Sequence, residues 1–227
     1  YHAARGYIEK LVAAGWRAAI CDQVGEVQAG KLVRREISQI LSPGTLDDFG
    51  LDDRKPNYLA ALCSRGDAFG MAFCDLSTGE FRLTELATLP ALLDELARVS
   101  PSEILVPDHQ TDQFATINPR SVLDGYVFES EPATDILRSH FKVHSLDGFG
   151  CADLPAGTGA AGALLHYITR QMRRQAGHLN RLQPYRCSQF LILDAASQSH
   201  LELVNSRAGR SMTLLGALDR TSTPMGA

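Results

Sequence analysis

The stretch that decides the fold is residues 57–106, which reads NYLAALCSRGDAFGMAFCDLSTGEFRLTELATLPALLDELARVSPSEILV. Its first part holds three apolar runs, which are separated by RGD and by STG. Each separator contains a glycine, the residue that tight turns favour. The pattern therefore predicts a three-stranded antiparallel meander at the start of this stretch.

A helix and a further strand should follow the meander. The segment LPALLDELARV places its leucines and Val99 on one helical face. Thr88 is suited to cap this helix, and Pro90 falls in the first turn, where no N–H is needed. Residues 103–107, EILVP, are typical of a short buried strand. Strand, strand, strand, helix, strand is the opening order of a ribonuclease-H-like sheet, and other α/β folds share that order.

The composition limits the class of protein. The 227 residues are 44% hydrophobic and 21% charged, which is ordinary for a globular chain. A formal charge of −4 argues against a protein that coats nucleic acid, although local basic surfaces stay possible. No apolar run is long enough for a membrane span. The five cysteines contain no C-x-x-C pair, so we expect no zinc site and a reducing compartment, the cytoplasm.

The residues outside the central stretch predict further elements. Upstream we expect a helix at 2–14, strands at 16–23 and 32–42, and a linker rich in Pro, Gly and Asp at 43–56. Downstream we expect a strand at 121–128, a helix at 131–141, a long helix at 158–175 that Gly177 ends, and a helix capped by Asp194. The chain starts without Met inside a helical pattern, so we expect a piece of a longer protein.

Three glycines match the dinucleotide-binding pattern G-x-G-x-x-G, namely Gly157, Gly159 and Gly162. That motif needs a strand directly before it and an acidic residue about twenty positions later. No strand pattern precedes these glycines, and no acid lies between Asp153 and Asp194. We therefore expect them to serve close helix packing.

Two groups of arginines are candidate binding residues. Arg170, Arg173 and Arg174 have i, i+3, i+4 spacing and should share one helix surface. Such a surface can hold phosphates or an acidic partner protein, and a solvated helix face is the alternative. Arg34 and Arg35 lie on an expected strand, where phosphate contact or ordinary surface charge would both fit.

The sequence favours a non-catalytic chain. Two-metal nucleases need carboxylates that converge within a few ångströms, and the first expected strand, NYLAALCS, has none. Asp75, Glu80 and Glu85 lie beside turns or on exposed strand positions. The enzymatic alternative is a stand-alone metal-dependent nuclease that uses Asp75 and nearby carboxylates. His140 and His144 have i, i+4 spacing without a third ligand, so we expect no metal site.

Several motifs, taken in order, resemble the MutS family of DNA mismatch repair proteins. They are AICDQ (19–23), RREISQILSPGT (34–45), NYLAAL, DLSTGEF (75–81), LILDAASQSHLEL and LLGALDRTSTPMGA. The resemblance covers essentially the whole chain and implies an α/β protein of four parts. These are the end of a mismatch-recognition domain (1–46), a linker (47–56), a ribonuclease-H-like connector domain with a mixed sheet (57–178) and the start of an α-helical lever domain (179–227).

The resemblance also implies a function. Members of the family form a clamp-like dimer that binds mismatched duplex DNA, uses ATP and Mg²⁺, and recruits MutL. The family's mismatch wedge and ATPase should lie outside these residues, so we expect no cofactor in this part and a role in transmitting conformation. The resemblance makes Arg34 and Arg35 candidate phosphate neighbours. Two residues depart from the family pattern, Asp22 in place of Glu and Gln39 in place of a common basic residue.

Overall fold

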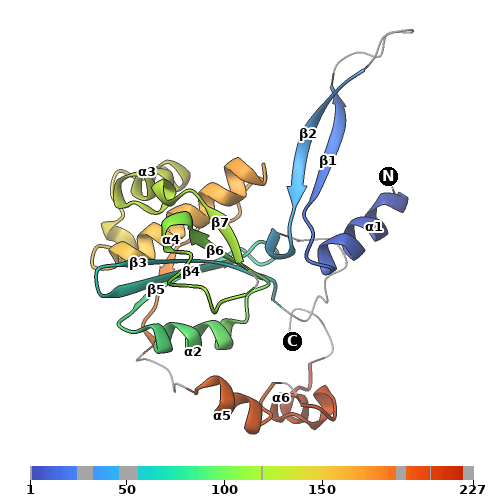
Figure 1. The fold of residues 1–227 in the computed structure, drawn as a ribbon, viewed down its shortest axis with the longest axis vertical. Helices are drawn as coiled ribbons and strands as arrows, with labels where there is room; N and C mark the ends of the chain where they lie inside the picture. The colour runs from blue at the N-terminus through green and yellow to red at the C-terminus, as the bar shows by residue number, and fades with distance from the viewer. Residues whose placement is uncertain are drawn as a thin grey trace.

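The computed structural model describes residues 2–24, 33–45, 56–118, 120–187, 193–204 and 206–221. Figure 1 shows a mixed sheet with helices on both faces, and a two-stranded hairpin that projects from one side. The fold is therefore mixed α/β, as the sequence predicts. Most of the predicted linker, residues 47–55, lies outside the described residues.

The central sheet has six strands in the order β7-β6-β3-β4-β5-β8. The predicted meander is confirmed, because β3 (Tyr58–Arg65), β4 (Ala68–Asp75) and β5 (Glu80–Leu86) pair antiparallel. The other strands pair parallel: β6 (Glu103–Pro107) with β3, β7 (Arg120–Leu123) with β6, and β8 (Gln183–Pro184) with β5.

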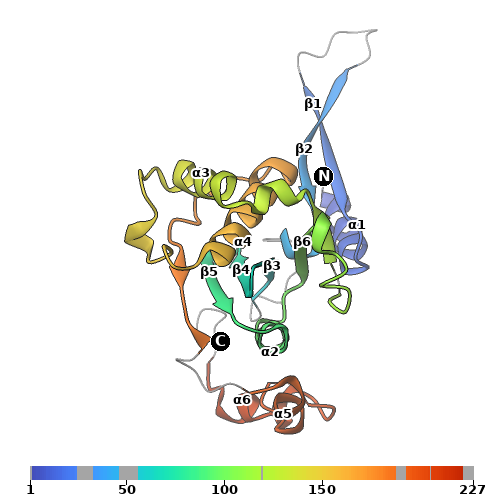
Figure 2. The same cartoon turned by 60° about the vertical axis from the view of Figure 1, so that its left-hand side comes forward.

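The continuous apolar run of β3 reflects burial on both faces of the sheet. Successive side chains point to opposite sides. Leu59 and Ala61 therefore join the apolar cluster under α4 (Pro155–His166), whereas Ala60 and Leu62 join the cluster under α2 (Leu89–Val99). Figure 2 shows α2 on one side of the sheet and α3 (Ser130–Phe141) with α4 on the other.

The sequence predicts α2 to the residue. Thr88 accepts a hydrogen bond from the backbone N–H of Ala91 at 3.3 Å, and Pro90 lies in the first turn. Ser100 ends the helix in the left-handed conformation with φ 50°. Its own N–H donates to the carbonyl of Leu96 at 2.7 Å. The cap and the apolar face both act as the sequence indicates.

Helix α4 lies close to its neighbours because glycines line the contacts. A Cβ at Gly70 of β4 would be 2.2 Å from the Ala156 carbonyl, and one at Gly159 would be 2.4 Å from the Phe128 carbonyl oxygen. A Cβ at Gly162 would be 2.4 Å from that of Ala133 in α3. The glycines of the G-x-G-x-x-G pattern thus lie inside a helix and serve packing, as expected.

Two sequence predictions in this part of the chain are wrong. The strand expected at 121–128 ends at Leu123, because Asp124 accepts from the N–H of Tyr126 and starts the 3₁₀ turn η3 (Gly125–Phe128). The long helix begins at Pro155 and ends well before Gly177. A π-helical turn, η5 (Tyr167–Gln171), follows α4.

The N-terminal segment consists of α1 (His2–Ala13), β1 (Ala18–Val24), β2 (Arg34–Leu41) and the 3₁₀ turn η1 (Pro43–Thr45). β1 and β2 form an antiparallel hairpin with a register shift between Ile20 and Cys21. Its cluster holds two fully buried side chains, Val12 and Leu41. Leu11, the neighbour of Val12 in α1, is 49% exposed.

The remaining elements are short. The C-terminal pair, α5 (Ala195–His200) and α6 (Leu214–Leu218), lies beyond α2 in Figure 1, and Asp194 caps α5 as predicted. Three further 3₁₀ turns are η2 (Asp108–Gln110), η4 (Asp147–Phe149) and η7 (Arg210–Met212). Over the described ranges, no helix is long and apolar enough to cross a membrane.

Candidate functional site

A buried carboxylate, Glu103, lies where the N-terminal segment meets the central sheet. Its side chain is at the start of β6 and is 4% exposed. One oxygen, Oε1, accepts from three side chains, and the other, Oε2, accepts from a backbone N–H. The donors are the Tyr167 hydroxyl at 2.6 Å, the Ser121 hydroxyl at 2.9 Å, Arg17 Nη2 at 3.4 Å and Gly44 N at 3.3 Å. We call these five residues the Glu103 junction.

The fold brings the junction together from distant parts of the chain. β6 and β7 are neighbours in the sheet, which places Ser121 beside Glu103. Tyr167 is the first residue of the π-helical turn η5. Gly44 belongs to η1, and a Cβ there would lie 2.9 Å from that of Glu103. Glycine is therefore required for the backbone N–H to approach the carboxylate.

The junction is a set of mutually dependent polar groups. Burial, together with the neighbouring Glu103 carboxylate, raises the pKa of Tyr167, so this phenol keeps its proton and donates. The Arg17 guanidinium lies 5.6 Å from the centre of the Tyr167 ring and is partly exposed. A buried carboxylate is costly unless its oxygens are hydrogen-bonded. Loss of one donor should therefore weaken the contacts that remain.

Backbone contacts extend the junction along β2 and η1. Arg173 Nη1 donates to the Ile37 carbonyl and Arg174 Nη1 donates to the Thr45 carbonyl, both at 2.5 Å. The N–H of Ile40 donates to the Met172 carbonyl at 3.2 Å. Burial lowers the pKa of Arg174. Both guanidinium groups thus fasten the N-terminal segment to the end of η5.

These contacts correct one sequence prediction. Arg170, Arg173 and Arg174 do not share a helix surface, because the helix ends at η5 and Arg173 has φ 53°. Arg170 is exposed, whereas Arg173 and Arg174 reach the N-terminal segment. Their role as a partner surface stays a prediction.

The other candidate arginines lie on the hairpin, apart from Glu103. Arg34 and Arg35 are exposed on β2, and successive strand residues point to opposite faces. Arg34 makes an ion pair with Glu36 at 2.8 Å, and its side chain is 80% exposed. Phosphate contact by these residues stays a prediction.

The carboxylates of the nuclease alternative have other partners. Asp75 accepts from the Ser77 N–H at 2.8 Å, and Glu80 accepts from the Tyr58 hydroxyl at 2.8 Å. Glu85 accepts from the first backbone N–H groups of α4. No group of three His, Cys, Asp or Glu residues that could hold a metal occurs within the described ranges. The nuclease alternative has no support here.

His140 and His144, which the sequence spacing brings into question as metal ligands, belong to no group of three such ligands within the described ranges. His140 Nε2 donates to the carbonyl of Leu179 at 2.7 Å, which satisfies that side chain. His144 is exposed. The sequence reasoning missed Glu103 altogether, although one signal was available. An acidic residue at the start of a run that is otherwise buried, EILVP, requires partners inside the fold.

Comparison with known proteins places the two sides of the Glu103 junction in two different family matches. Residues 57–180 match the family described as MutS domain II, and residues 1–50 match MutS domain I. The chain belongs to the MutS family. Arg17 and Gly44 fall within the match to domain I, whereas Glu103, Ser121 and Tyr167 fall within the match to domain II. The Glu103 junction therefore lies between two domains of the MutS family.

Curated relatives agree over the whole chain. It is 42% identical to the DNA mismatch repair protein MutS of Syntrophobacter fumaroxidans and 40% identical to those of Protochlamydia amoebophila and Myxococcus xanthus. In each comparison all of this chain is covered, together with 27%, 28% and 27% of the respective relative. The chain thus spans about a quarter of the length of these MutS relatives.

Proposed function

We propose that this chain is the part of a mismatch repair protein that links a DNA-reading domain to a connector, without catalysing a reaction itself. The observation that carries the proposal is the Glu103 junction. It joins the two family matches through one buried carboxylate and donors from both sides. A change in the N-terminal segment would reach the sheet at this point.

The strand order supports a ribonuclease-H-like connector. Numbered from the start of the sheet, β3 to β7 run in the order 5-4-1-2-3, with an antiparallel meander followed by two parallel strands. Enzymes with that architecture need carboxylates that converge on metal ions. Here β3 carries no carboxylate, and the nearby acids hold turns, a tyrosine and a helix. We therefore propose a structural use of the fold.

The junction suggests how conformation would pass between the domains. Hydrogen bonds to one buried group are directional and depend on one another, so they tend to form and break together. Movement of Gly44 or Arg17 would remove donors from Glu103 and change the position of Tyr167. Tyr167 begins the π-helical turn that ends α4, and such turns are frequent at functional sites. The end of α4 is then the element that responds.

We also propose, for the longer protein of which this chain is a part, the functions that the resemblance to the family implies. They are binding of mismatched duplex DNA, use of ATP and Mg²⁺, recruitment of MutL, dimerisation and a cytoplasmic location. In this chain Arg34 and Arg35 are the candidate phosphate neighbours, because they are exposed on the projecting hairpin.

A binding and activity assay tests the non-catalytic part of the proposal. The 227-residue chain, mixed with ATP and Mg²⁺, should release no phosphate above background, and Mg²⁺ or Mn²⁺ should give no cleavage of DNA or RNA. It should bind a G·T heteroduplex and the matched homoduplex with similar affinity. Heteroduplex binding at least tenfold tighter, or cleavage that Asp75→Asn abolishes, would overturn the proposal.

A distance measurement tests the role of the junction. In a Cys187→Ser background, which removes the half-exposed thiol, one spin label is attached at the exposed Cys21 of β1 and a second at a cysteine replacing the exposed Asp67 in the β3–β4 turn. Pulsed electron resonance should give one narrow distance distribution. Glu103→Gln should broaden that distribution, whereas Glu131→Gln on the surface of α3 should not. A Glu103→Gln variant that keeps the narrow distribution would show that the junction does not fix the N-terminal segment.

A further inference from the structure

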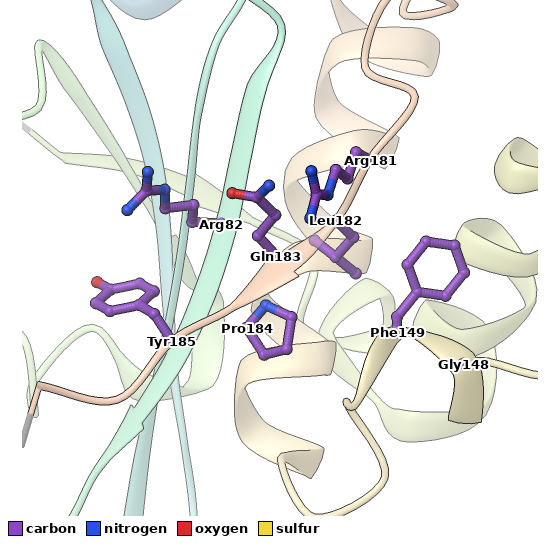
Figure 3. Close-up of a pocket in the computed structure, with 8 residues that line it drawn as sticks. All are labelled: Arg82, Gly148, Phe149, Arg181, Leu182, Gln183, Pro184 and Tyr185. Atoms are coloured by element: carbon purple, nitrogen blue, oxygen red, sulfur yellow. The ribbon is translucent and has the colours of Figure 1, made fainter. Parts of the chain in front are cut away.

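An open groove runs along the edge of the sheet at β8, away from the Glu103 junction. Its volume is about 540 Å³, and its lining includes Arg82 of β5, Arg181 and Gln183 beside or on β8, and Phe149 of η4. Figure 3 shows Arg82, Gln183 and Arg181 in one row across β5 and β8, with Phe149 at the far end. No acidic residue lines the groove.

The row consists almost entirely of hydrogen-bond donors. Arg82 and Gln183 are cross-strand partners. Figure 3 draws the Gln183 amide with its nitrogen toward Arg181, which has only donors to offer it. With the amide oxygen and nitrogen exchanged, the Gln183 oxygen accepts from Arg181 Nε at 2.9 Å and from Nη1 at 3.2 Å. This leaves the Gln183 NH₂ group as a donor between two guanidinium groups. Only Arg82 has a carboxylate beside it, Glu80 at 2.7 Å. The row therefore has spare donors for an anionic oxygen.

The backbone of this edge is poorly suited to pairing with another strand. Tyr185 donates its N–H to the Leu83 carbonyl at 3.0 Å, so the backbone N–H of Tyr185 points toward β5. The backbone nitrogen of Pro184 therefore points away from β5, along the outer edge. Proline has no N–H, which removes a donor from the middle of the free edge. Recognition in this groove must therefore come from side chains.

The surroundings favour a short acidic peptide over a nucleic acid. Phe149 and Pro184 give the groove an apolar wall beside the donors. Glu80 pairs with Arg82, and the exposed Asp147 directly precedes the lining residue Gly148. A long polyanion would be repelled by Glu80 and by Asp147. A peptide, in contrast, can place one carboxylate on the arginines and an apolar side chain on Phe149.

We propose that this groove, the β8 groove, is a docking site for an acidic segment of a partner protein. Charge complementarity and the apolar wall define the occupant. The site differs from Arg173 and Arg174, whose guanidinium groups already donate to backbone carbonyls of the same chain. The proposal does not rest on the role of the chain in DNA repair.

Fluorescence anisotropy with defined probes tests the proposal. The probes are a labelled octapeptide of alternating Asp and Leu, its counterpart of alternating Asn and Leu, and a labelled oligothymidylate of twelve nucleotides. The acidic peptide should bind the 227-residue chain at least tenfold more tightly than the Asn peptide, and binding should weaken as salt screens the charges. Equal binding of the two peptides, or tight binding of the oligothymidylate alone, would overturn the proposal.

Three variants locate the binding. Gln183→Glu keeps the volume of the side chain and places a carboxylate between the arginines, so it should weaken the acidic peptide at least tenfold while the melting temperature stays equal or rises. Arg181→Glu should weaken it at least as much. The matched control, Arg207→Glu, reverses an exposed arginine elsewhere and should change the affinity less than twofold. Binding that survives Gln183→Glu and Arg181→Glu would place the peptide outside the β8 groove.

Discussion

The central sheet and the N-terminal segment are held in place by different kinds of contact. The sheet has a large apolar cluster on each face, and most of their side chains are fully buried. The N-terminal segment has a cluster with two fully buried side chains, Val12 and Leu41. Its attachment to the sheet uses hydrogen bonds to Glu103 and from Arg173 and Arg174. One region has its own core, and the other depends on polar contacts with it.

This difference has consequences for motion. Apolar burial has no direction, and it is lost only when the whole sheet opens. The hydrogen bonds to the buried Glu103 carboxylate depend on geometry, and they can be lost together at the junction while the sheet stays closed. Local opening of the N-terminal segment should therefore cost much less than global unfolding. The segment can change position while the sheet stays folded.

The largest expected effect is in the sheet core. Leu83 of β5 is fully buried in the apolar cluster under α4. Leu83→Ala should therefore lower the free energy of unfolding by about 2–5 kcal/mol. Urea denaturation followed by circular dichroism measures the change. Val12→Ala in the small cluster should leave the main transition nearly unchanged. Similar losses for the two variants would show that the N-terminal segment shares the stability of the sheet.

Removal of the junction carboxylate should have the next largest effect. Glu103→Ala leaves the Tyr167 and Ser121 hydroxyls and the Gly44 N–H without their acceptor, at a cost of about 1–3 kcal/mol. Limited trypsin digestion should release the N-terminal segment faster, while the sheet stays intact. Tyr167→Phe should give a smaller increase in the same direction. Unchanged digestion would mean that the junction does not hold the segment.

A third effect concerns the start of α4. Glu85 of β5 accepts from the N–H groups of Ala156 and Gly157, which no side chain of α4 itself caps. Glu85→Ala should therefore destabilise the sheet unit by about 1–2 kcal/mol, as the loss of a helix cap does. Glu85→Gln retains an acceptor and should lose less. Equal stability of Glu85→Ala and the parent chain in urea would contradict this assignment.

Alkaline pH should destabilise the sheet unit through its buried thiols. Burial raises the pKa of Cys63 to about 12 from an ordinary value of about 9. Between pH 9 and pH 12 the folded chain keeps a thiol proton that the unfolded chain releases. The contribution of this thiol to the free energy of unfolding is therefore complete below pH 9 and is lost as pH rises toward 12. Cys63 alone should lower the free energy of unfolding by about 1 kcal/mol between pH 8 and pH 10, and the pKa values of the Cys74 and Cys151 thiols are raised as well. Urea midpoints at both pH values measure this, and Cys63→Ala should reduce the difference.

The smallest effect is expected on the hairpin. Arg34 pairs with Glu36 at the surface, and its side chain is 80% exposed. Arg34→Ala should change the free energy of unfolding by less than about 0.5 kcal/mol, because exposed ion pairs contribute little. A much larger loss in urea denaturation would show that the hairpin depends on this pair more than its exposure indicates.

The sequence predicts well where local chemistry decides the structure. The cap at Thr88, the apolar face of α2 and the turns of the meander are all local, and all are confirmed. Asp194 is a further cap that the sequence identifies correctly. The mixed α/β class follows from the order of these elements.

The sequence predicts poorly where distant contacts decide. Directly after η5, Met172 accepts from the N–H of Ile40 in β2, and Arg173 takes a left-handed conformation. No local pattern indicates either feature. The apolar run after Glu103 indicates that this acid needs partners inside the fold, but no local pattern identifies Tyr167 and Gly44 as those partners. The helix face that the sequence predicts for Arg173 and Arg174 is wrong for the same reason.

The cap of α4 also bears on the order in which the chain folds. Glu85 and Ala156 are 71 positions apart, so the first turn of α4 obtains its acceptor only after β5 has been placed. The meander that contains β5 needs only contacts between neighbouring strands joined by short turns, and such contacts form early. A ribosome also releases the meander first. We therefore expect the glycine-rich helix, which is a poor helix former by itself, to form on the meander after the meander has folded.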